Sequence, residues 1–151
     1  MKFLFPRSNN NSKEEKTILF VCVENAGRSQ MAEGFFNQKY RPKGYWAISA
    51  GTRPVSQINP LAVQVMKEVG INISSQKSKI ITEDMIKGSE KSINMGCMDK
   101  SECPVLFINN VVDWRIEDPK GKPIERVRKI RDDIERRVRE IAESLKRQNS
   151  G

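Results

Sequence analysis

A short apolar run at residues 17–23, TILFVCV, is the sequence feature that most restricts the fold of this chain. Strands buried on both faces of a parallel sheet have this nearly continuous, β-branched character. Between Ser29 and Tyr40 a second period appears, because apolar residues recur at helical spacing. These residues are Met31, Ala32, Phe35 and Phe36. A buried strand that leads after a few residues into a helix predicts an α/β protein.

The rest of the chain repeats this alternation. Residues 44–50 predict a second strand, and Asn59 with Pro60 predicts the N-cap and first residue of a helix that Gly70 ends. The later expected elements are a short helix capped by Thr82, strands at residues 92–95 and 105–109, and a long helix after the Asp118–Pro119 turn. Apolar residues step by three or four from Ile124 to Leu145, so one face of that helix should pack on the sheet. Such alternation favours a parallel sheet with helices on both faces, where ligands bind beyond the carboxyl ends of the strands.

The domain organisation follows from length and patterning. The 151 residues are enough for one domain. We expect residues 1–16 to form a mobile polar extension and residues 17–148 to form a single domain. No segment has the pattern of a signal peptide or of a membrane span, so we expect a cytoplasmic protein without a membrane partner. Thiols stay reduced there, and the three cysteines are therefore interpreted as catalytic, redox or metal-binding residues.

Charge and composition narrow the chemistry further. The chain has no histidine, which excludes a histidine base, nucleophile or metal ligand. Its net charge of +8 attracts anions in general. Many basic residues follow Pro119, but acidic residues are interspersed with them, as on a solvated helix face. Because no nucleic-acid module is visible, a basic non-catalytic binding module is the weakest interpretation, and we expect no nucleic-acid partner.

The segment from Cys22 to Ser29, C-V-E-N-A-G-R-S, has the pattern of an anion cradle between a strand and a helix. Backbone N–H groups of such a loop can turn inward around an oxyanion, and the helix adds its positive end. The candidate substrate-binding residues are Val23, Glu24, Asn25, Ala26, Gly27 and Arg28. Arg28 can direct two donors at the anion, and Ser29 can donate its hydroxyl to a thiolate at Cys22, the candidate nucleophile. Gly27 and Asn25 permit unusual backbone angles. The alternative is a buried structural cysteine.

These residues are similar to those of the low-molecular-weight protein tyrosine phosphatase superfamily, especially its thioredoxin-coupled arsenate reductase branch. The resemblance is carried by FVCVENAGRSQMAEGFF at the loop, SAGT at residues 49–52, NPLAVQVMKEVGI in the next helix and the Asp118–Pro119 turn. It implies a four-stranded parallel sheet with flanking helices. It also implies a nucleophile at Cys22, an anion-binding arginine at Arg28 and a general acid at Asp118. Gly27 departs from many relatives, which carry a second cysteine there that is not the nucleophile.

Two further cysteines, in the segment MGCMDKSECP, bear on the choice between two activities. A phosphatase needs neither, because water hydrolyses its cysteinyl-phosphate. The resemblance to the reductase branch implies a relay: Cys97 attacks the Cys22 adduct and releases arsenite, Cys103 moves the disulfide to Cys97–Cys103, and thioredoxin or a similar dithiol reduces it. Two alternatives remain, a phosphatase that uses Cys22 alone and a zinc site at Cys97 and Cys103. Two cysteines without a histidine or a further pair make a poor zinc site.

The surroundings of the pocket favour a small anion. After Asp118–Pro119 the chain reads Lys120-Gly121-Lys122, where the phosphatase branch tends to have aromatic residues, although the fold can still bring Trp46 or Trp114 close. The resemblance also matches Glu33, Asn25 and Ser49 to polar positions that bind potassium in some reductases. Glu33 can equally be a surface residue of the helix, and we expect no metal site and no cofactor.

Overall fold

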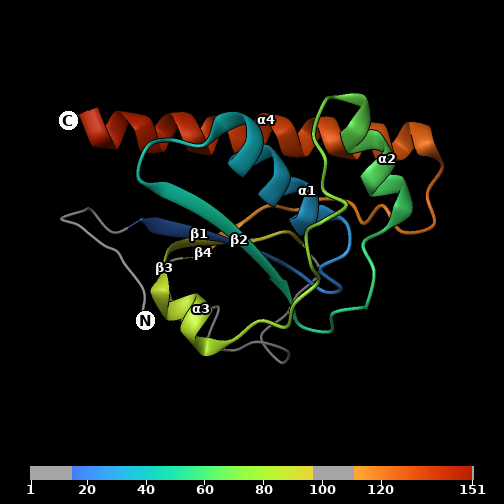
Figure 1. Ribbon diagram of the computed structural model, residues 1–151, viewed down its shortest axis with the longest axis horizontal. Helices are drawn as coiled ribbons and strands as arrows, with labels where there is room; N and C mark the ends of the chain where they lie inside the picture. The colour runs from blue at the N-terminus through green and yellow to red at the C-terminus, as the bar shows by residue number, and fades with distance from the viewer. Residues whose placement is uncertain (1–14, 97–110, 151) are drawn as a thin grey trace, which may run out of the picture.

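The computed structural model of the protein describes residues 15–96 and 111–150. Its elements are β1 (Lys16–Cys22), α1 (Arg28–Phe35), the π-helical η1 (Phe36–Tyr40), β2 (Tyr45–Gly51), α2 (Pro60–Glu68), α3 (Glu83–Gly88), β3 (Ser89–Asn94), β4 (Val111–Asp113) and α4 (Ile124–Ser150). The four strands form one parallel sheet in the order β2-β1-β3-β4 (Figure 1). The predicted α/β class and the four-stranded parallel sheet are confirmed.

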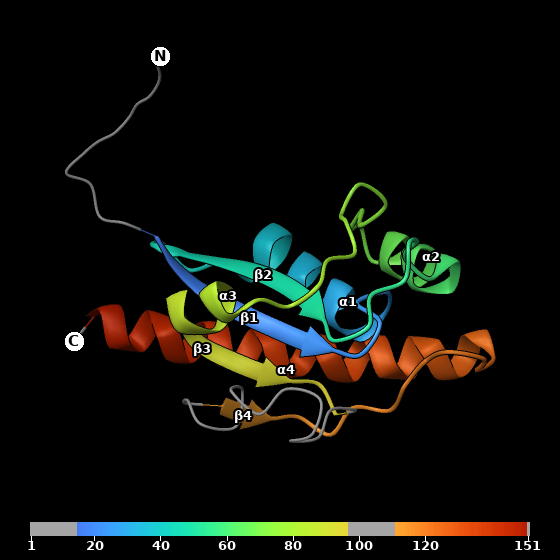
Figure 2. The same ribbon diagram turned by 90° about the horizontal axis from the view of Figure 1, so that it is seen from below.

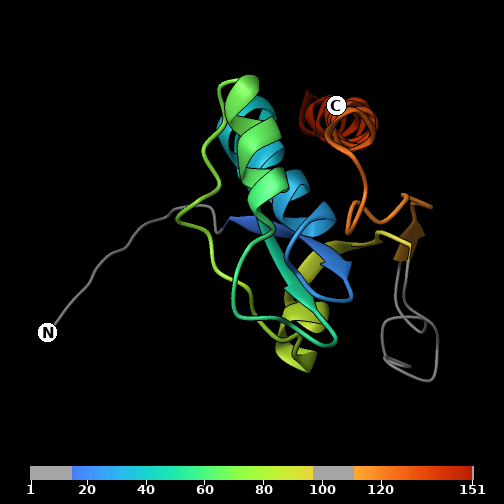
Figure 3. The ribbon, with the colours of Figure 1, turned by 90° about the vertical axis from the view of Figure 1, so that its right-hand side faces the viewer.

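Helices cover both faces of the sheet. Figure 3 shows α1, α2 and α4 on one side and α3 on the other. The larger core cluster joins the first side of the sheet to α1, α2 and α4, whereas a smaller cluster joins Leu19, Val21 and Ala50 to Ile86 of α3. Burial on both faces explains why β1 reads as an unbroken apolar run, since residues 18–21 are fully buried.

The order of the strands places the end of β1 at a topological switch point. The chain passes from β1 to β2 on one side and later returns to β3 on the other side of β1. Connections that leave a strand in opposite directions open a crevice at its carboxyl end. In Figure 2 the arrowheads of β1, β2 and β3 point toward the same end of the molecule. Cys22, the last residue of β1, therefore lies where a ligand is expected.

Local sequence signals explain the helix boundaries. The Asn59 side chain accepts a hydrogen bond from Leu61 N at 2.9 Å and so caps α2, as predicted. The left-handed Gly70, with φ +83°, lies just after this helix. Thr82 caps α3 by accepting from Met85 N at 3.1 Å, also as predicted.

Several predicted boundaries shift. The helix expected from Ser29 to Tyr40 begins at Arg28 and changes to a π-helical turn at Phe36, whose last residues contact Glu135 of α4. The third strand begins at Ser89, three residues before the expected start. The predicted strand at residues 105–109 lies outside the described residues, as does the expected extension except for Glu15 and Lys16, the latter being the first residue of β1.

The long helix α4 has the predicted apolar face and also contacts its neighbouring helices. Its buried side chains belong to the core cluster that contains Phe20 and Ile93 of the sheet. Arg131 is buried as well, and its Nη1 donates to Val65 O of α2 at 2.9 Å. Within residues 15–96 and 111–150, no helix combines the length and apolar character needed to cross a membrane.

Candidate active site

The loop between β1 and α1 is held from outside through its carbonyl groups. Six successive carbonyl oxygens accept hydrogen bonds: Cys22 O from Thr52 N (3.3 Å), Val23 O from Arg53 N (2.8 Å), Glu24 O from Val55 N (3.2 Å), Asn25 O from Gln30 Nε2 (2.9 Å), Ala26 O from Asn59 N (2.8 Å) and Gly27 O from Met31 N (2.9 Å). In a trans peptide the N–H points away from the C=O. Because the carbonyls face outward, the N–H groups face the inside of the loop, which is the geometry of an anion cradle.

Asn25 shapes this loop from within. As predicted, it adopts an unusual backbone conformation, which is left-handed with φ 51°, and the residue is fully buried. The side-chain Oδ1 accepts from Lys79 N at 2.8 Å, while Nδ2 donates to Ser29 Oγ at 2.7 Å and to Ser49 Oγ at 3.0 Å. One amide thus ties the loop to α1, to β2 and to the segment before α3.

Gly51, the last residue of β2, allows the loop to approach the sheet. A Cβ atom at this position would lie 2.4 Å from Val23 O and 2.9 Å from Asn25 N. Such distances are far below van der Waals contact, so no other residue fits without moving the loop. Gly51 lies in the SAGT segment, but sequence reasoning assigned it no physical role.

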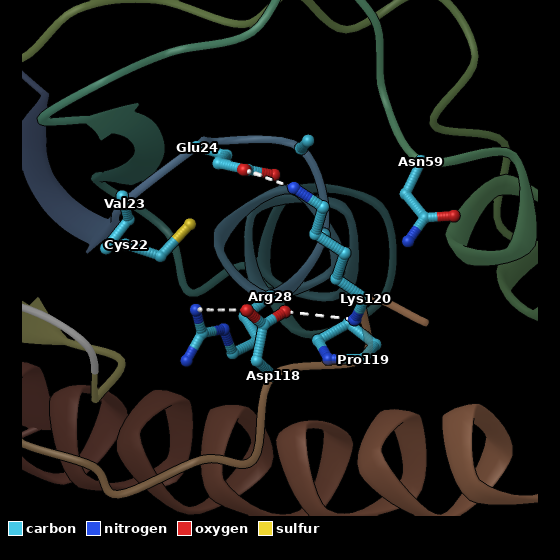
Figure 4. A pocket seen from close by; sticks show the side chains of 10 residues that line it. Cys22, Val23, Glu24, Arg28, Asn59, Asp118, Pro119 and Lys120 are labelled. Carbon is cyan, nitrogen blue, oxygen red and sulfur yellow. Dashed lines mark hydrogen bonds and ion pairs between the residues drawn. The ribbon is translucent and has the colours of Figure 1, made fainter. Parts of the chain in front are cut away.

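The thiol of Cys22 lies at the bottom of the cradle. Its Sγ is 2.9 Å from Ser29 Oγ, and the residue is 2% exposed. Because Ser29 Oγ already accepts from Asn25 Nδ2, its own proton is free to point at the sulfur. Figure 4 shows the sulfur directed into the pocket. A hydroxyl that donates to sulfur stabilises the thiolate, the nucleophilic form.

Arg28 is oriented by carbonyl groups from two distant segments. Its Nη1 donates to Met95 O at 3.3 Å and to Ile116 O at 3.1 Å, and the residue is 3% exposed. Its Nη2 lies 3.7 Å from Asp118 Oδ2. These contacts hold the guanidinium beside the pocket, so the structure brings Cys22, Arg28 and Asp118 together as the resemblance implied.

The pocket has a volume of about 190 Å³. Its lining residues are Cys22, Val23, Glu24, Ala26, Gly27, Arg28, Asn59, Asp118, Pro119 and Lys120. None of these described lining residues is aromatic. Trp114 packs against Phe20 instead, and Arg41 stacks on Trp46 of β2. A pocket of this size and polarity suits a tetrahedral oxyanion.

Three lining residues were not predicted as part of the site. Asn59 was assigned only as a helix cap, yet Figure 4 shows its amide nitrogen turned toward the pocket while Oδ1 caps α2. Pro119 closes against the loop, because a Cβ atom on Gly27 would lie 3.1 Å from its Cγ. Lys120 reaches Glu24 across the pocket, with 2.9 Å between Nζ and Oε2. The Asp118–Pro119 turn and Lys120 were placed near the pocket by the resemblance, whereas nothing in the local sequence marked Asn59 as part of the site.

The residues matched to a potassium site are neighbours, but they do not fit that ion here. Ser49 Oγ donates to Glu33 Oε1 at 2.5 Å, and Asn25 turns its NH₂ group toward Ser49. Lys79 Nζ, 3.9 Å from Glu33 Oε1, already supplies a positive charge. Burial raises the pKa of Glu33, which Ser49 and Lys79 oppose, and burial lowers the pKa of Lys79. In this structure Glu33 is a partly buried carboxylate that accepts a hydrogen bond from the Ser49 hydroxyl and lies near the Lys79 ammonium.

Cys97 and Cys103 lie outside the described residues. Cys22 is the cysteine that lies within the described residues, and its thiol is at the base of the pocket. Its loop, its helix and Arg28 together place the thiol of Cys22 at a pocket that suits an anion.

Residues 17–150 match the family described as low molecular weight phosphotyrosine protein phosphatase. The chain belongs to this family. The match spans every described element except the first residue of β1, so the fold and the Cys22 loop are family features.

Similar proteins include reductases and phosphatases. An arsenate reductase from Brevibacillus brevis is 37% identical over 133 residues, which cover 87% of this chain and 98% of the relative. A solved thioredoxin-dependent arsenate reductase from Corynebacterium glutamicum is 35% identical with a TM-score of 0.74, covering 93% of this chain and 65% of that one. A solved arginine phosphatase from Geobacillus stearothermophilus is 27% identical with a TM-score of 0.78, covering 88% and 94% of the two chains.

Proposed function

We propose that this protein is an arsenate reductase whose chemistry begins with the thiolate of Cys22. The observation that carries the proposal is the contact of Cys22 Sγ with Ser29 Oγ at the base of a small pocket that Arg28 flanks. The relatives named arsenate reductases, which include a thioredoxin-dependent one, support arsenate as the substrate and thioredoxin as the partner.

The first step is displacement at arsenic. The Cys22 sulfur donates an electron pair to arsenic, an S–As bond forms and one As–O bond breaks. Asp118, half exposed at the rim, gives its proton to the departing oxygen, which leaves as water. Arg28 and the inward N–H groups stabilise the charge on the remaining oxygens.

The second step reduces arsenic. The Cys97 thiolate attacks the Cys22 sulfur, an S–S bond forms, and the electron pair of the S–As bond stays on arsenic, which departs as arsenite. Cys103 then exchanges into this disulfide and frees Cys22. Thioredoxin, or a similar dithiol, returns two electrons to Cys97–Cys103. The relay needs thiols that are reduced at rest, which fits a cytoplasmic location.

Phosphoester hydrolysis is the second candidate, because the same loop accepts phosphate. It needs only Cys22, Arg28, Asp118 and water, and the similarity to an arginine phosphatase favours it. The absence of aromatic residues from the described lining of the pocket argues against a tyrosine-phosphate ring.

A coupled assay separates the two activities. Arsenate is supplied with thioredoxin, thioredoxin reductase and NADPH, and NADPH consumption is followed. We expect turnover in the wild type that is lost in Cys97→Ser and in Cys103→Ser, because each substitution interrupts electron transfer.

An aryl phosphate provides the matched control. Cys97→Ser and Cys103→Ser should leave its hydrolysis unchanged, whereas Cys22→Ser should abolish both activities. Arsenate turnover that persists in both relay variants would exclude the proposed mechanism, and hydrolysis without any arsenate turnover in the wild type would favour a phosphatase.

A further inference from the structure

An ion pair crosses the mouth of the pocket. Lys120 Nζ lies 2.9 Å from Glu24 Oε2, and Figure 4 shows the lysine side chain running from the Asp118–Pro119 turn toward the Cys22 loop. Both residues line the pocket that holds the Cys22 thiol. The two sides of the opening are thus joined through side chains.

The two sides of the pair are held differently: the Glu24 backbone is tied to other segments, and the Lys120 backbone bonds within its own turn. Glu24 O accepts from Val55 N at 3.2 Å and from Ser78 Oγ at 3.1 Å. Lys120 N donates to Asp118 Oδ1 at 3.0 Å. Opening the mouth therefore requires the Glu24 and Lys120 side chains to separate.

Each partner affects what the pocket accepts. A carboxylate at the rim repels an incoming oxyanion, and Lys120 neutralises it. The Glu24 carboxylate raises the pKa of Lys120, so the lysine stays charged at neutral pH. The lysine stem crosses between the two sides of the pocket, so the organic group of a phosphoester bound at Cys22 would have to extend past it. An inorganic oxyanion has no such group and fits beneath the pair.

We propose that Glu24 and Lys120 form a clasp that selects small inorganic oxyanions over organic phosphoesters. The inference rests on the proposed function, because it specifies the substrate class of the same site. The Lys120 side chain is 68% exposed and that of Glu24 is 34% exposed. Exposed ion pairs are weak, so the clasp opens readily, and we expect it to change selectivity by roughly three- to fivefold.

Binding of two ligands to the full chain tests the clasp without any turnover. Inorganic phosphate represents the small anion, and phenylphosphonate represents an ester that cannot be hydrolysed. Isothermal titration calorimetry gives both dissociation constants. In the double variant Glu24→Gln/Lys120→Gln, we expect phenylphosphonate to bind about three- to fivefold more tightly and phosphate to change by less than about twofold.

The single variants separate charge from steric hindrance. Lys120→Gln leaves Glu24 unbalanced and should weaken phosphate binding a few-fold, whereas Glu24→Gln leaves Lys120 unpaired and should strengthen it. Raising the salt concentration should shift the wild-type ratio toward that of the double variant, because salt screens exposed pairs.

Lys122→Gln is the matched control. It removes the same charge from the same turn, but its partner Glu117 lies 3.8 Å away and neither residue lines the pocket. We expect its ratio of the two dissociation constants to equal that of the wild type.

Two results would overturn the clasp: a phenylphosphonate-to-phosphate ratio in the double variant equal to that of the wild type, or an equal change in Lys122→Gln. A wild type that binds neither ligand overturns it as well. Failure of the proposed function is a different result, namely no arsenate-dependent NADPH consumption, and it leaves both dissociation constants measurable.

Discussion

The two sides of the pocket differ in how firmly they are built. The Cys22 loop is largely buried: Asn25 and Ser29 are completely inaccessible, and every carbonyl from Cys22 to Gly27 has a donor. On the opposite side, the side chains of Asp118 and Lys120 are 52% and 68% exposed and are held mainly by ion pairs. Buried networks keep one geometry because an unpaired polar group there is costly, whereas exposed pairs exchange with water. The Cys22 loop therefore fixes the position at which an anion can bind. The exposed side chains of the turn at Asp118–Lys120 affect which ligands can enter the pocket.

Among the substitutions that test this difference between the two sides, the largest effect should come from Arg28, which connects them. In Arg28→Lys a single ammonium replaces a guanidinium that donates to Met95 O and Ile116 O and that we propose also binds the anion. We expect kcat/KM to fall by at least about 100-fold. The control Arg126→Lys changes an exposed partner of Glu117 and should stay within about twofold. A loss below tenfold for Arg28→Lys would contradict a fixed guanidinium.

Gly51→Ala tests the rigidity of the loop itself. The added Cβ would meet Val23 O, so the loop must shift. We expect a loss of about 1–3 kcal/mol in the free energy of unfolding, measured with urea, and a roughly tenfold lower kcat/KM. Gly88→Ala, where a Cβ meets nothing within 4 Å, should change stability by less than about 0.5 kcal/mol. Wild-type behaviour of Gly51→Ala would show that the loop adapts.

Ser29→Ala removes the hydroxyl that lies 2.9 Å from Cys22 Sγ. The thiolate loses a charge-assisted hydrogen bond, so we expect alkylation of Cys22 by iodoacetate at neutral pH to slow by roughly tenfold. Ser89→Ala, whose hydroxyl donates to Met85 O far from the pocket, is the control. An unchanged alkylation rate in Ser29→Ala would mean that the hydroxyl does not stabilise the thiolate.

The smallest effect concerns Glu33, at the back of the loop. Because burial raises its pKa above the usual 4.5, the folded protein retains a proton that the unfolded chain releases. The stability that this group contributes is present below about pH 4.5 and is lost as the pH rises through its folded pKa. Glu33→Gln cannot ionise, so its free energy of unfolding relative to the wild type should increase with pH, by at most about 1.4 kcal/mol per pH unit.

Glu135→Gln provides a control of opposite sign. Burial alone would raise the pKa of Glu135, but hydrogen bonds from Lys39 and Tyr40 outweigh it and leave the pKa lowered. Its contribution to stability is present above the usual 4.5 and is lost as the pH falls, so Glu135→Gln should lose stability relative to the wild type as the pH rises. Equal pH dependence in both variants would rule out burial as the cause at Glu33.

What the sequence determined by itself is the local part of this molecule. The apolar run of β1, the cap at Asn59, the stop at Gly70 and the apolar stripe of α4 follow from patterns within a few residues, and the structure confirms each. The same holds for the Cys22 loop, because a strand, a turn and a helix within eight residues leave few ways to arrange the backbone. Several boundaries lie one to three residues from the predicted ones, because local patterns place the ends of elements less precisely than their centres.

Only the tertiary structure decided how distant segments complete the site. The carbonyl groups that orient Arg28, the close approach at Gly51 and the Glu24–Lys120 pair each join residues far apart in the chain. The approach of Lys79 to Glu33 likewise joins residues that are far apart in the chain. Contacts of this kind depend on which loops come together at the carboxyl edge of the sheet. The order of the strands in the sheet decides which loops are neighbours, and no local pattern of residues encodes that order.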